Sequence, residues 1–158
     1  MGIAGNFPAA FTKTQLAIDY EPPRGGEVFI SVNDGDKRNI TAIARSIARL
    51  GFSLVATMGT ARALRASGIE CEEVGKIHAG SHTILDRIAS GEIVLMINTP
   101  FGSSTNTDGY EMRAACVRHG VSYCTTLAGA QALIAGMEAV RETGLDVIAL
   151  QDLPQWEG

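Results

Sequence analysis

The stretch "VATMGTARAL", residues 55–64, runs an apolar strand pattern directly into a helical one. The apolar run over residues 53–57 ends at Thr57, and helical spacing of apolar residues follows over 60–68. Between them lies Gly59, with a threonine on either side. Because strand-to-helix turns of this kind recur in α/β proteins, this stretch predicts an α/β fold. It also raises the question of which ligand the turn could bind.

The same alternation recurs along the rest of the chain. Short apolar strands alternate with amphipathic helices, which is typical of a parallel sheet covered on both faces. We therefore predict a three-layer, doubly wound α/β fold, with a mostly parallel sheet of about five strands and helices on both faces. The strands are expected at 27–32, 53–57, 71–75, 92–98 and 121–125, the helices at 36–51, 60–68, 81–91, 107–120 and 126–144, and a last edge strand at 146–153.

Three parts of unequal size are indicated. Residues 1–20 carry a short apolar stripe that is too small to bury itself alone. The stretch "EPPRGG" at 21–26 has the prolines and glycines of a linker. The main body is predicted over 27–158.

Composition limits the classes of function. The 158 residues are 46% hydrophobic and 19% charged, which is typical of a folded domain, and the formal net charge of -4 argues against general attraction to nucleic acid or acidic lipid. No run of about 18 apolar residues and no signal-peptide pattern occurs, so we expect a cytoplasmic protein without a membrane partner. Cys71, Cys116 and Cys124 are not spaced like metal ligands or a redox pair, so reduced cysteines are expected.

Polar residues gather where the predicted strands end. In parallel sheets, ligands bind beyond the carboxyl ends of the strands, so these positions become the candidate site. In chain order they are Lys37, Thr57, Gly59, Thr60, Lys76, Asn98, Thr99, Ser103, Asp108 and Thr125.

The turn around Gly59 favours an anion. A helix N-terminus offers unpaired N–H groups, Gly59 permits close approach, and Thr57, Thr60, Lys37 and Lys76 add hydroxyls and positive charge. The plainer alternatives are that Thr60 is only a helix N-cap and that the lysines are ordinary surface residues. No P-loop or dinucleotide-binding glycine pattern is present.

Catalytic chemistry is only weakly indicated. His78 and His82 are candidate bases and Ser81 a candidate nucleophile, but the G-x-S-x-G pattern of serine hydrolases is missing. We therefore expect no catalytic residue in this chain.

Five motifs together resemble one known family. "SVNDGDK", "VATMGTARAL", "KIHAGSHTILDRIASGE", "INTPFG" and "DGYEMRAACVRHGVSYCTTLAGAQALI" are similar, in order and spacing, to the C-terminal regulatory domain of the carbamoyl-phosphate synthetase large subunit, in the methylglyoxal synthase-like superfamily. The resemblance covers 27–152. Residues 1–17 resemble the last helix of the preceding synthetase domain, which implies that this chain is part of a longer one.

The resemblance implies a regulatory site for UMP or IMP. Lys37, Thr57, Thr60 and Lys76 would meet the phosphate and Asn98 would help to hold the ligand. Pro100 stands where the family has a hydroxyl, so one ribose or phosphate contact is either lost or replaced by Ser103 or Thr99. Ser103 and Ser104 stand where many members have arginines. Asp108 and Thr125 match one half of an ornithine site.

The resemblance also implies partners and an activity for the parent protein. These are the rest of the large subunit, the glutaminase small subunit and further copies of the chain. The parent would make carbamoyl phosphate from bicarbonate, glutamine and ATP, for pyrimidine and arginine biosynthesis. ATP, Mg²⁺ and K⁺ would bind in the synthetase domains, with no cofactor in this chain.

Two other functions stay open. A methylglyoxal synthase-type lyase would act on dihydroxyacetone phosphate, although Ser81 stands where that enzyme has its aspartate base, and a serine hydroxyl alone is a poor base. A module that serves only oligomerisation would bind no ligand.

Overall fold

The computed structural model describes residues 2–17, 21–75, 83–100 and 107–144, together with 147, 149 and 151. The chain divides into two compact units, Pro23–Gln131 and a smaller one made of Met1–Pro22 with Ala132–Gly158. Each unit is described by itself. The predicted division at 20 and 26 into tail, linker and main body stays a prediction.

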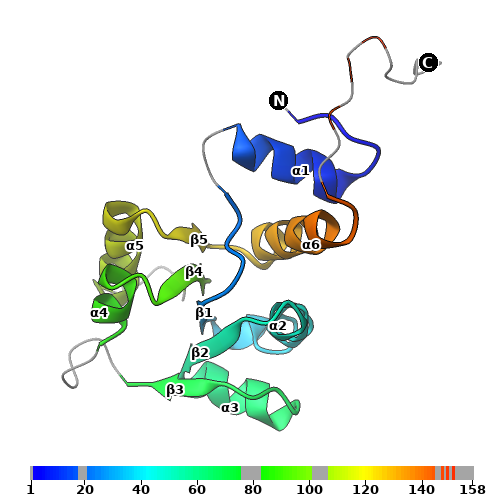
Figure 1. The fold of residues 1–158 in the computed structure, drawn as a ribbon. Helices are drawn as coiled ribbons and strands as arrows, with labels where there is room; N and C mark the ends of the chain where they lie inside the picture. The colour runs from blue at the N-terminus through cyan, green and yellow to red at the C-terminus, as the bar shows by residue number, and fades with distance from the viewer. Residues whose placement is uncertain are drawn as a thin grey trace. The chain divides into compact units, whose positions relative to one another are not determined.

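The larger unit is built on a parallel sheet (Figure 1). The strand order is β3-β2-β1-β4-β5, every described pair is parallel, and β1 is the middle strand. This confirms the predicted fold class. The strands are β1 (Glu27–Ser31), β2 (Ser53–Thr57), β3 (Glu72–Val74), β4 (Ile93–Asn98) and β5 (Ser122–Cys124).

Helices cover both faces of this sheet. In Figure 1, α4 and α5 lie against one face and α2 and α3 against the other. The helices are α1 (Phe7–Leu16), α2 (Ile40–Arg49), α3 (Met58–Ala66), α4 (Ile84–Ala89), α5 (Thr107–His119) and α6 (Leu127–Thr143), with a 3-10 turn at Asp34–Asp36. The boundary between the two units falls within α6.

The core on the α4–α5 face is apolar and fully buried. Phe29, Val55 and Met96, from three neighbouring strands, pack with residues of α4 and α5 in one cluster. Because strand side chains alternate between faces, the residues two positions further along each strand lie on this same face at the strand ends. The core therefore fixes which side chains reach the rim.

A buried arginine ties α4 to the sheet. Arg87 is 6% exposed, and its guanidinium donates to Glu27 at 2.6 Å and to Glu72 at 2.7 and 3.1 Å. Its Nε lies 3.4 Å from Glu92 without hydrogen-bond geometry. The hydrogen bonds to Glu72, followed by those to Glu27, raise the pKa of Arg87 above its usual value although burial opposes this.

The smaller unit contains α1. Asn6 caps this helix by accepting the N–H of Ala9 at 2.9 Å. A Cβ at Gly136 of α6 would collide with the Thr12 hydroxyl, so glycine is needed where α6 meets α1. Phe7 of the predicted apolar stripe is 65% exposed.

Three predicted helix starts are wrong. The helix expected over 81–91 begins at Ile84, because Thr83 is its N-cap. The helix expected over 36–51 begins only at Ile40, because Asn33 closes a separate 3-10 turn ahead of it. The helix expected from Thr60 begins at Met58, so Thr60 is inside the first turn and is not the N-cap. The edge strand expected over 146–153 falls almost wholly outside the described residues, and 147, 149 and 151 are in no strand.

Candidate functional site

Three polar side chains stand in a row at the carboxyl ends of neighbouring strands. Ser31 and Asn98 are register partners of β1 and β4, and the Thr57 hydroxyl donates to Ser31 Oγ at 3.3 Å. All three follow the buried core residues of the α4–α5 face by two positions. At about 4.8 Å between strands, the row spans about 10 Å from Thr57 to Asn98.

The helix that follows Thr57 starts without a side-chain cap. Thr57 has the extended backbone of an N-cap residue, with φ −65° and ψ 151°, but its side chain accepts no helix N–H. The first N–H groups of α3, at Met58, Gly59 and Thr60, therefore have no intrahelical or cap partner. This end of the nine-residue helix carries a partial positive charge.

Lys37 lies at this helix start. A Cβ at position 59 would lie 3.0 Å from Lys37 Nζ, so the absence of a side chain at Gly59 lets the ammonium approach the first turn of α3. The Lys37 side chain is 30% exposed and pairs with Asp34. An ammonium, an uncapped helix end and a threonine hydroxyl are the groups that bind a phosphoryl anion.

Thr60 is buried and stabilises the site through hydrogen bonds to its neighbours. It is 1% exposed, its Oγ1 accepts the N–H of Val32 at 3.2 Å, and Thr57 Oγ1 lies 3.4 Å away. The hydroxyl therefore joins the end of β1 to the start of α3. It retains its hydrogen for one further bond.

Thr99 holds the loop after β1. Its hydroxyl oxygen accepts the backbone N–H of Asn33 at 3.0 Å and the side-chain Nδ2 of Asn33 at 3.1 Å. Asn33 in turn donates to Asp36 at 2.7 Å and accepts the N–H of Asp36 at 3.1 Å. Thr99 thus fixes the turn that precedes Lys37, and direct contact between Thr99 and a ligand stays a prediction.

Asn98 and Arg113 converge on Gly109 in the first turn of α5. Asn98 is 6% exposed, and its Nδ2 donor has no hydrogen-bond partner in the described part of the chain. A Cβ at Gly109 would lie 3.5 Å from this Nδ2 and 3.2 Å from Arg113 Nη1. Sequence reasoning missed Arg113, because its closeness to Asn98 depends on how α5 packs and no local spacing indicates it.

The other predicted residues form no hydrogen bond with one another in the described part of the chain, or lie outside it. Asp108 is half-buried in the first turn of α5 and Thr125 is exposed after β5, and no hydrogen bond joins them within the described ranges. Lys76 and Ser103 lie outside the described residues, as do His78, Ser81 and His82. The structure thus brings together Lys37, Thr57, Gly59 and Thr60, with Asn98 further along the row.

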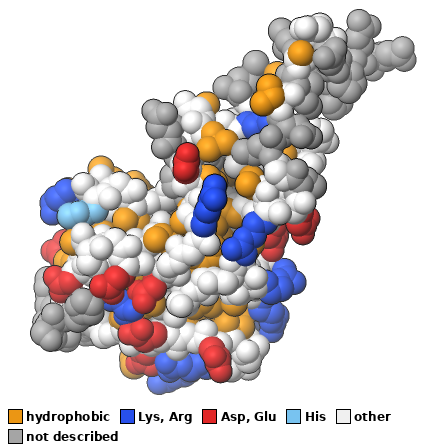
Figure 2. Space-filling model, viewed as in Figure 1, with side chains coloured by type: hydrophobic (Ala, Val, Ile, Leu, Met, Phe, Trp, Pro, Cys, Tyr) orange, Lys and Arg blue, Asp and Glu red, His pale blue; other side chains and the backbone are white. Residues whose placement is uncertain are grey.

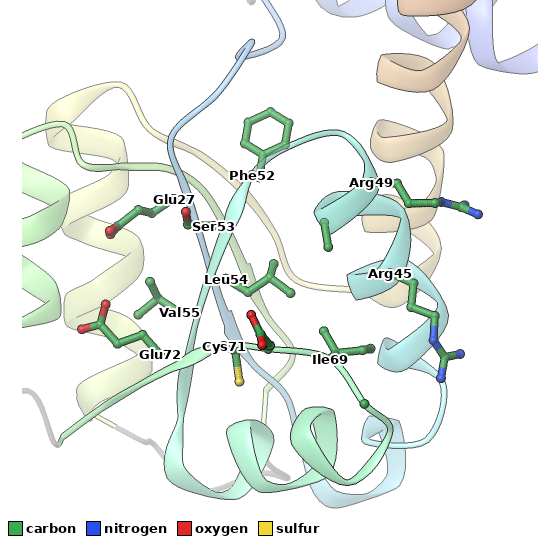
Figure 3. A pocket seen from close by; sticks show the side chains of 13 residues that line it. Glu27, Arg45, Arg49, Phe52, Ser53, Leu54, Val55, Ile69, Cys71 and Glu72 are labelled. Carbon is green, nitrogen blue, oxygen red and sulfur yellow. The ribbon is translucent and has the colours of Figure 1, made fainter.

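A separate groove of about 880 Å³ contains none of the predicted site residues (Figure 3). Its apolar lining includes Phe52, Leu54 and Ile69, and Arg45 and Arg49 point outward from α2 beside it. In Figure 2, basic side chains lie along α2, and acidic ones gather between α4 and β3. The groove follows the first half of β2, whereas the candidate site lies at the end of that strand.

The cysteines are thiols without a visible chemical role. Cys71, Cys116 and Cys124 form no disulfide, and burial raises the pKa of both Cys116 and Cys124 to about 11. Burial also raises the pKa of Cys71. Within the described ranges no cluster of acidic, cysteine and histidine residues suits a metal ion, and no helix there has the length and hydropathy to cross a membrane.

Comparison with known protein families assigns this chain to a family. The model of the MGS-like domain matches residues 39–125, which run from the start of α2 to the end of β5. The chain belongs to the MGS-like domain family. The match includes Thr57, Gly59, Thr60 and Asn98, whereas Lys37 lies just before it.

MGS-like relatives extend the similarity to nearly the whole chain. It is 49% identical over 154 residues to the carbamoyl phosphate synthase large chain, C-terminal section, of Methanopyrus kandleri, which covers 97% of this chain and 28% of that protein. It is 41% identical over 152 residues to the carbamoyl phosphate synthase large chain of Myxococcus xanthus, covering 96% and 14%. The chain thus spans about a quarter or less of the length of these relatives.

A solved structure supports the fold alone. The crystal structure of ForH is similar with a TM-score of 0.52 and 19% identity, over 75% of this chain and 80% of that one.

Proposed function

We propose that this chain is the effector-binding regulatory domain of a carbamoyl phosphate synthase large chain. It holds the phosphate of a nucleoside monophosphate, with UMP as the first candidate and IMP as the second. The rest of the large chain, with ATP, Mg²⁺ and K⁺, would carry out the synthesis of carbamoyl phosphate. The domain contributes no catalytic residue, and it acts by binding the effector differently in two states of the whole enzyme.

The uncapped start of α3 beside Lys37 carries this proposal. A phosphoryl group placed there would accept the first N–H groups of the helix and the Lys37 ammonium, and would meet the hydroxyl of Thr57. Charge-assisted hydrogen bonds of this kind are about twice as strong as neutral ones. No acidic residue occupies the first turn of α3 to oppose the anion.

The nucleoside would extend along the strand ends toward α5. Asn98 offers a buried donor that has no partner among the described residues, and Arg113 adds a guanidinium next to Gly109. The row of about 10 Å from Thr57 to Asn98 suits a ligand with a phosphate at one end and hydroxyl or carbonyl acceptors at the other. Arg113 is thereby added to the predicted binding residues.

Asp108 and Thr125 are proposed as half of an ornithine site. A carboxylate and a hydroxyl would hold the amino groups of ornithine, and the other half would come from the rest of the large chain. The proposal therefore includes that larger chain, the glutaminase subunit and a second copy of this chain as partners.

Thermal unfolding with UMP and with uridine tests the nucleotide site. At about 100 times its Kd, a ligand of the native state adds about 2.7 kcal/mol of stability, which for a domain of this size raises Tm by about 5–10 °C. UMP should produce this shift and uridine should not, because only UMP brings the phosphate. Equal shifts with the two ligands would contradict a phosphate site.

A pair of lysine variants locates the binding. Lys37→Met should weaken UMP binding at least about thirtyfold by removing the ammonium at the start of α3. Lys13→Met removes the same charge from α1, where Lys13 donates to the Ile3 carbonyl, and should leave UMP affinity unchanged. Retained affinity in Lys37→Met would place the nucleotide elsewhere.

A further inference from the structure

Lys37 already has an anionic partner within the chain. Asp34 Oδ1 lies 2.5 Å from Lys37 Nζ, and the Asp34 side chain is 74% exposed against 30% for Lys37. The Lys37 ammonium thus lies close to Gly59 and also contacts the carboxylate of the solvent-exposed Asp34. The ammonium expected to receive a phosphate is therefore paired with a competitor of the same charge sign as the ligand.

The short turn after β1 fixes this pairing. Asp34 and Lys37 are three residues apart, and the backbone N–H of Lys37 donates to the Asp34 carbonyl at 3.4 Å. Asn33 caps the turn, and it is held in place by Thr99. Asp34 is thus presented to Lys37 by a turn that is itself tied to the strand ends.

The neighbouring acid has a different task. Asp36 accepts from the Asn33 side chain at 2.7 Å and donates its backbone N–H to the Asn33 amide oxygen. Its carboxylate therefore stabilises the turn, whereas the Asp34 carboxylate bonds to Lys37. This separation lets Asp34 leave Lys37 without unfolding the turn.

We propose that Asp34 is an affinity-setting residue of the effector site, acting as a built-in competitor for the Lys37 ammonium. This inference rests on the proposed nucleotide site. A phosphoryl group that binds at α3 must either displace Asp34 from Lys37 or tolerate its charge nearby. Both effects weaken binding, so the site fills only at higher nucleotide concentration than its donors alone would require.

Removal of the Asp34 charge tests this role. In isothermal titration of the 158-residue chain with UMP, at about 20 mM salt, Asp34→Asn should bind about threefold to tenfold more tightly than wild type. Because the competing charge is exposed, the gain should shrink to less than about twofold at 0.5 M salt. A merely structural effect of the substitution would not show this salt dependence.

Glu70→Gln is the matched control. Glu70 is exposed before β3, and the substitution removes the same charge at the groove rather than at the site. Its UMP affinity should stay within about 1.5-fold of wild type. Asp34→Asn binding no tighter than Glu70→Gln, with unchanged Tm in both, would overturn the competitor role.

Titration of the wild-type chain with UMP and with inorganic phosphate distinguishes failure of the Asp34 proposal from failure of the nucleotide site itself. If wild type binds UMP or phosphate and Asp34→Asn gains nothing, Asp34 is not a competitor and the nucleotide site stands. If wild type binds neither, the proposed site falls, and the inference about Asp34 falls with it.

Discussion

Helices α3 and α4 begin in the same way and use their first turns differently. Each follows a threonine with an extended backbone, Thr57 for α3 and Thr83 for α4. Thr83 forms a full capping box, in which its hydroxyl accepts the N–H of Asp86 at 3.4 Å and its own N–H donates to the Asp86 carboxylate at 2.8 Å. Thr57 caps nothing. The first turn of α4 is closed by its own residues, whereas that of α3 is left open.

The residue at the third helical position explains the difference. In α4 this residue is Asp86, whose carboxylate completes the capping box. In α3 it is Thr60, whose hydroxyl is turned to the backbone of Val32. The positive end of α3 is therefore not neutralised from within, which is what an anion site requires. The first turn of α4 thus stabilises the fold through its own residues, whereas the first turn of α3 has free N–H groups that, under the proposed function, would bind the ligand.

Arg87→Met should give the largest effect, and on stability alone. It removes the guanidinium that joins α4 to Glu27 and Glu72 and leaves these carboxylates close together, which should cost about 2–4 kcal/mol of unfolding free energy. Urea unfolding measures this loss. Arg65→Met, which breaks the exposed pair with Glu73, should cost less than about 1 kcal/mol. Equal losses would show that burial of Arg87 is unimportant.

Thr57→Asp should convert the first turn of α3 into one like that of α4. A carboxylate at the N-cap would close the helix, raising stability by about 0.5 kcal/mol, and would repel the phosphate of UMP. We expect UMP affinity to fall by about thirtyfold or more, measured by titration. Thr57→Asn caps without charge and should lose less. Undiminished UMP binding in Thr57→Asp would show that α3 does not meet the phosphate.

The smallest expected effect comes from a crossed pair of alanine variants. Thr83→Ala should lower the unfolding free energy by about 1 kcal/mol through loss of the cap and leave UMP affinity unchanged. Thr57→Ala should lower UMP affinity by about threefold to tenfold with little loss of stability, because its hydroxyl caps no helix. Unfolding curves and titrations of both variants decide this. Identical behaviour of the two variants would abolish the distinction between the helices.

Sequence patterns predicted the sheet because its signals are local. The strand over 53–57 was predicted with its true bounds, since an apolar run directly before a helical pattern leaves little freedom. The start of α2 was misplaced because the 3-10 turn depends on Asn33, which Thr99 holds from 66 residues away. The local spacing of residues does not indicate a contact between positions so far apart in the sequence.

The residues of the candidate site also divide into those that local sequence patterns predict and those that depend on tertiary contacts. Lys37, Thr57, Gly59 and Thr60 could be found because strand ends of a parallel sheet share one edge. Arg113 could not, because its relation to Asn98 depends on the packing of α5 against β4. The partners of Arg87 were equally hidden, since Glu27 is 60 residues away. Whether these site residues bind a nucleotide stays a prediction.

The buried amide of Asn98, which we propose contacts the effector, lowers the stability of the ligand-free domain. Its donor is withdrawn from water and has no acceptor within the described ranges, which costs the ligand-free domain about 1–3 kcal/mol. An apolar residue of similar size at this position should raise the unfolding free energy of the ligand-free domain and, under the proposed function, weaken effector binding. Under the proposed function, selection for heat resistance and selection for effector binding would therefore favour different residues at position 98.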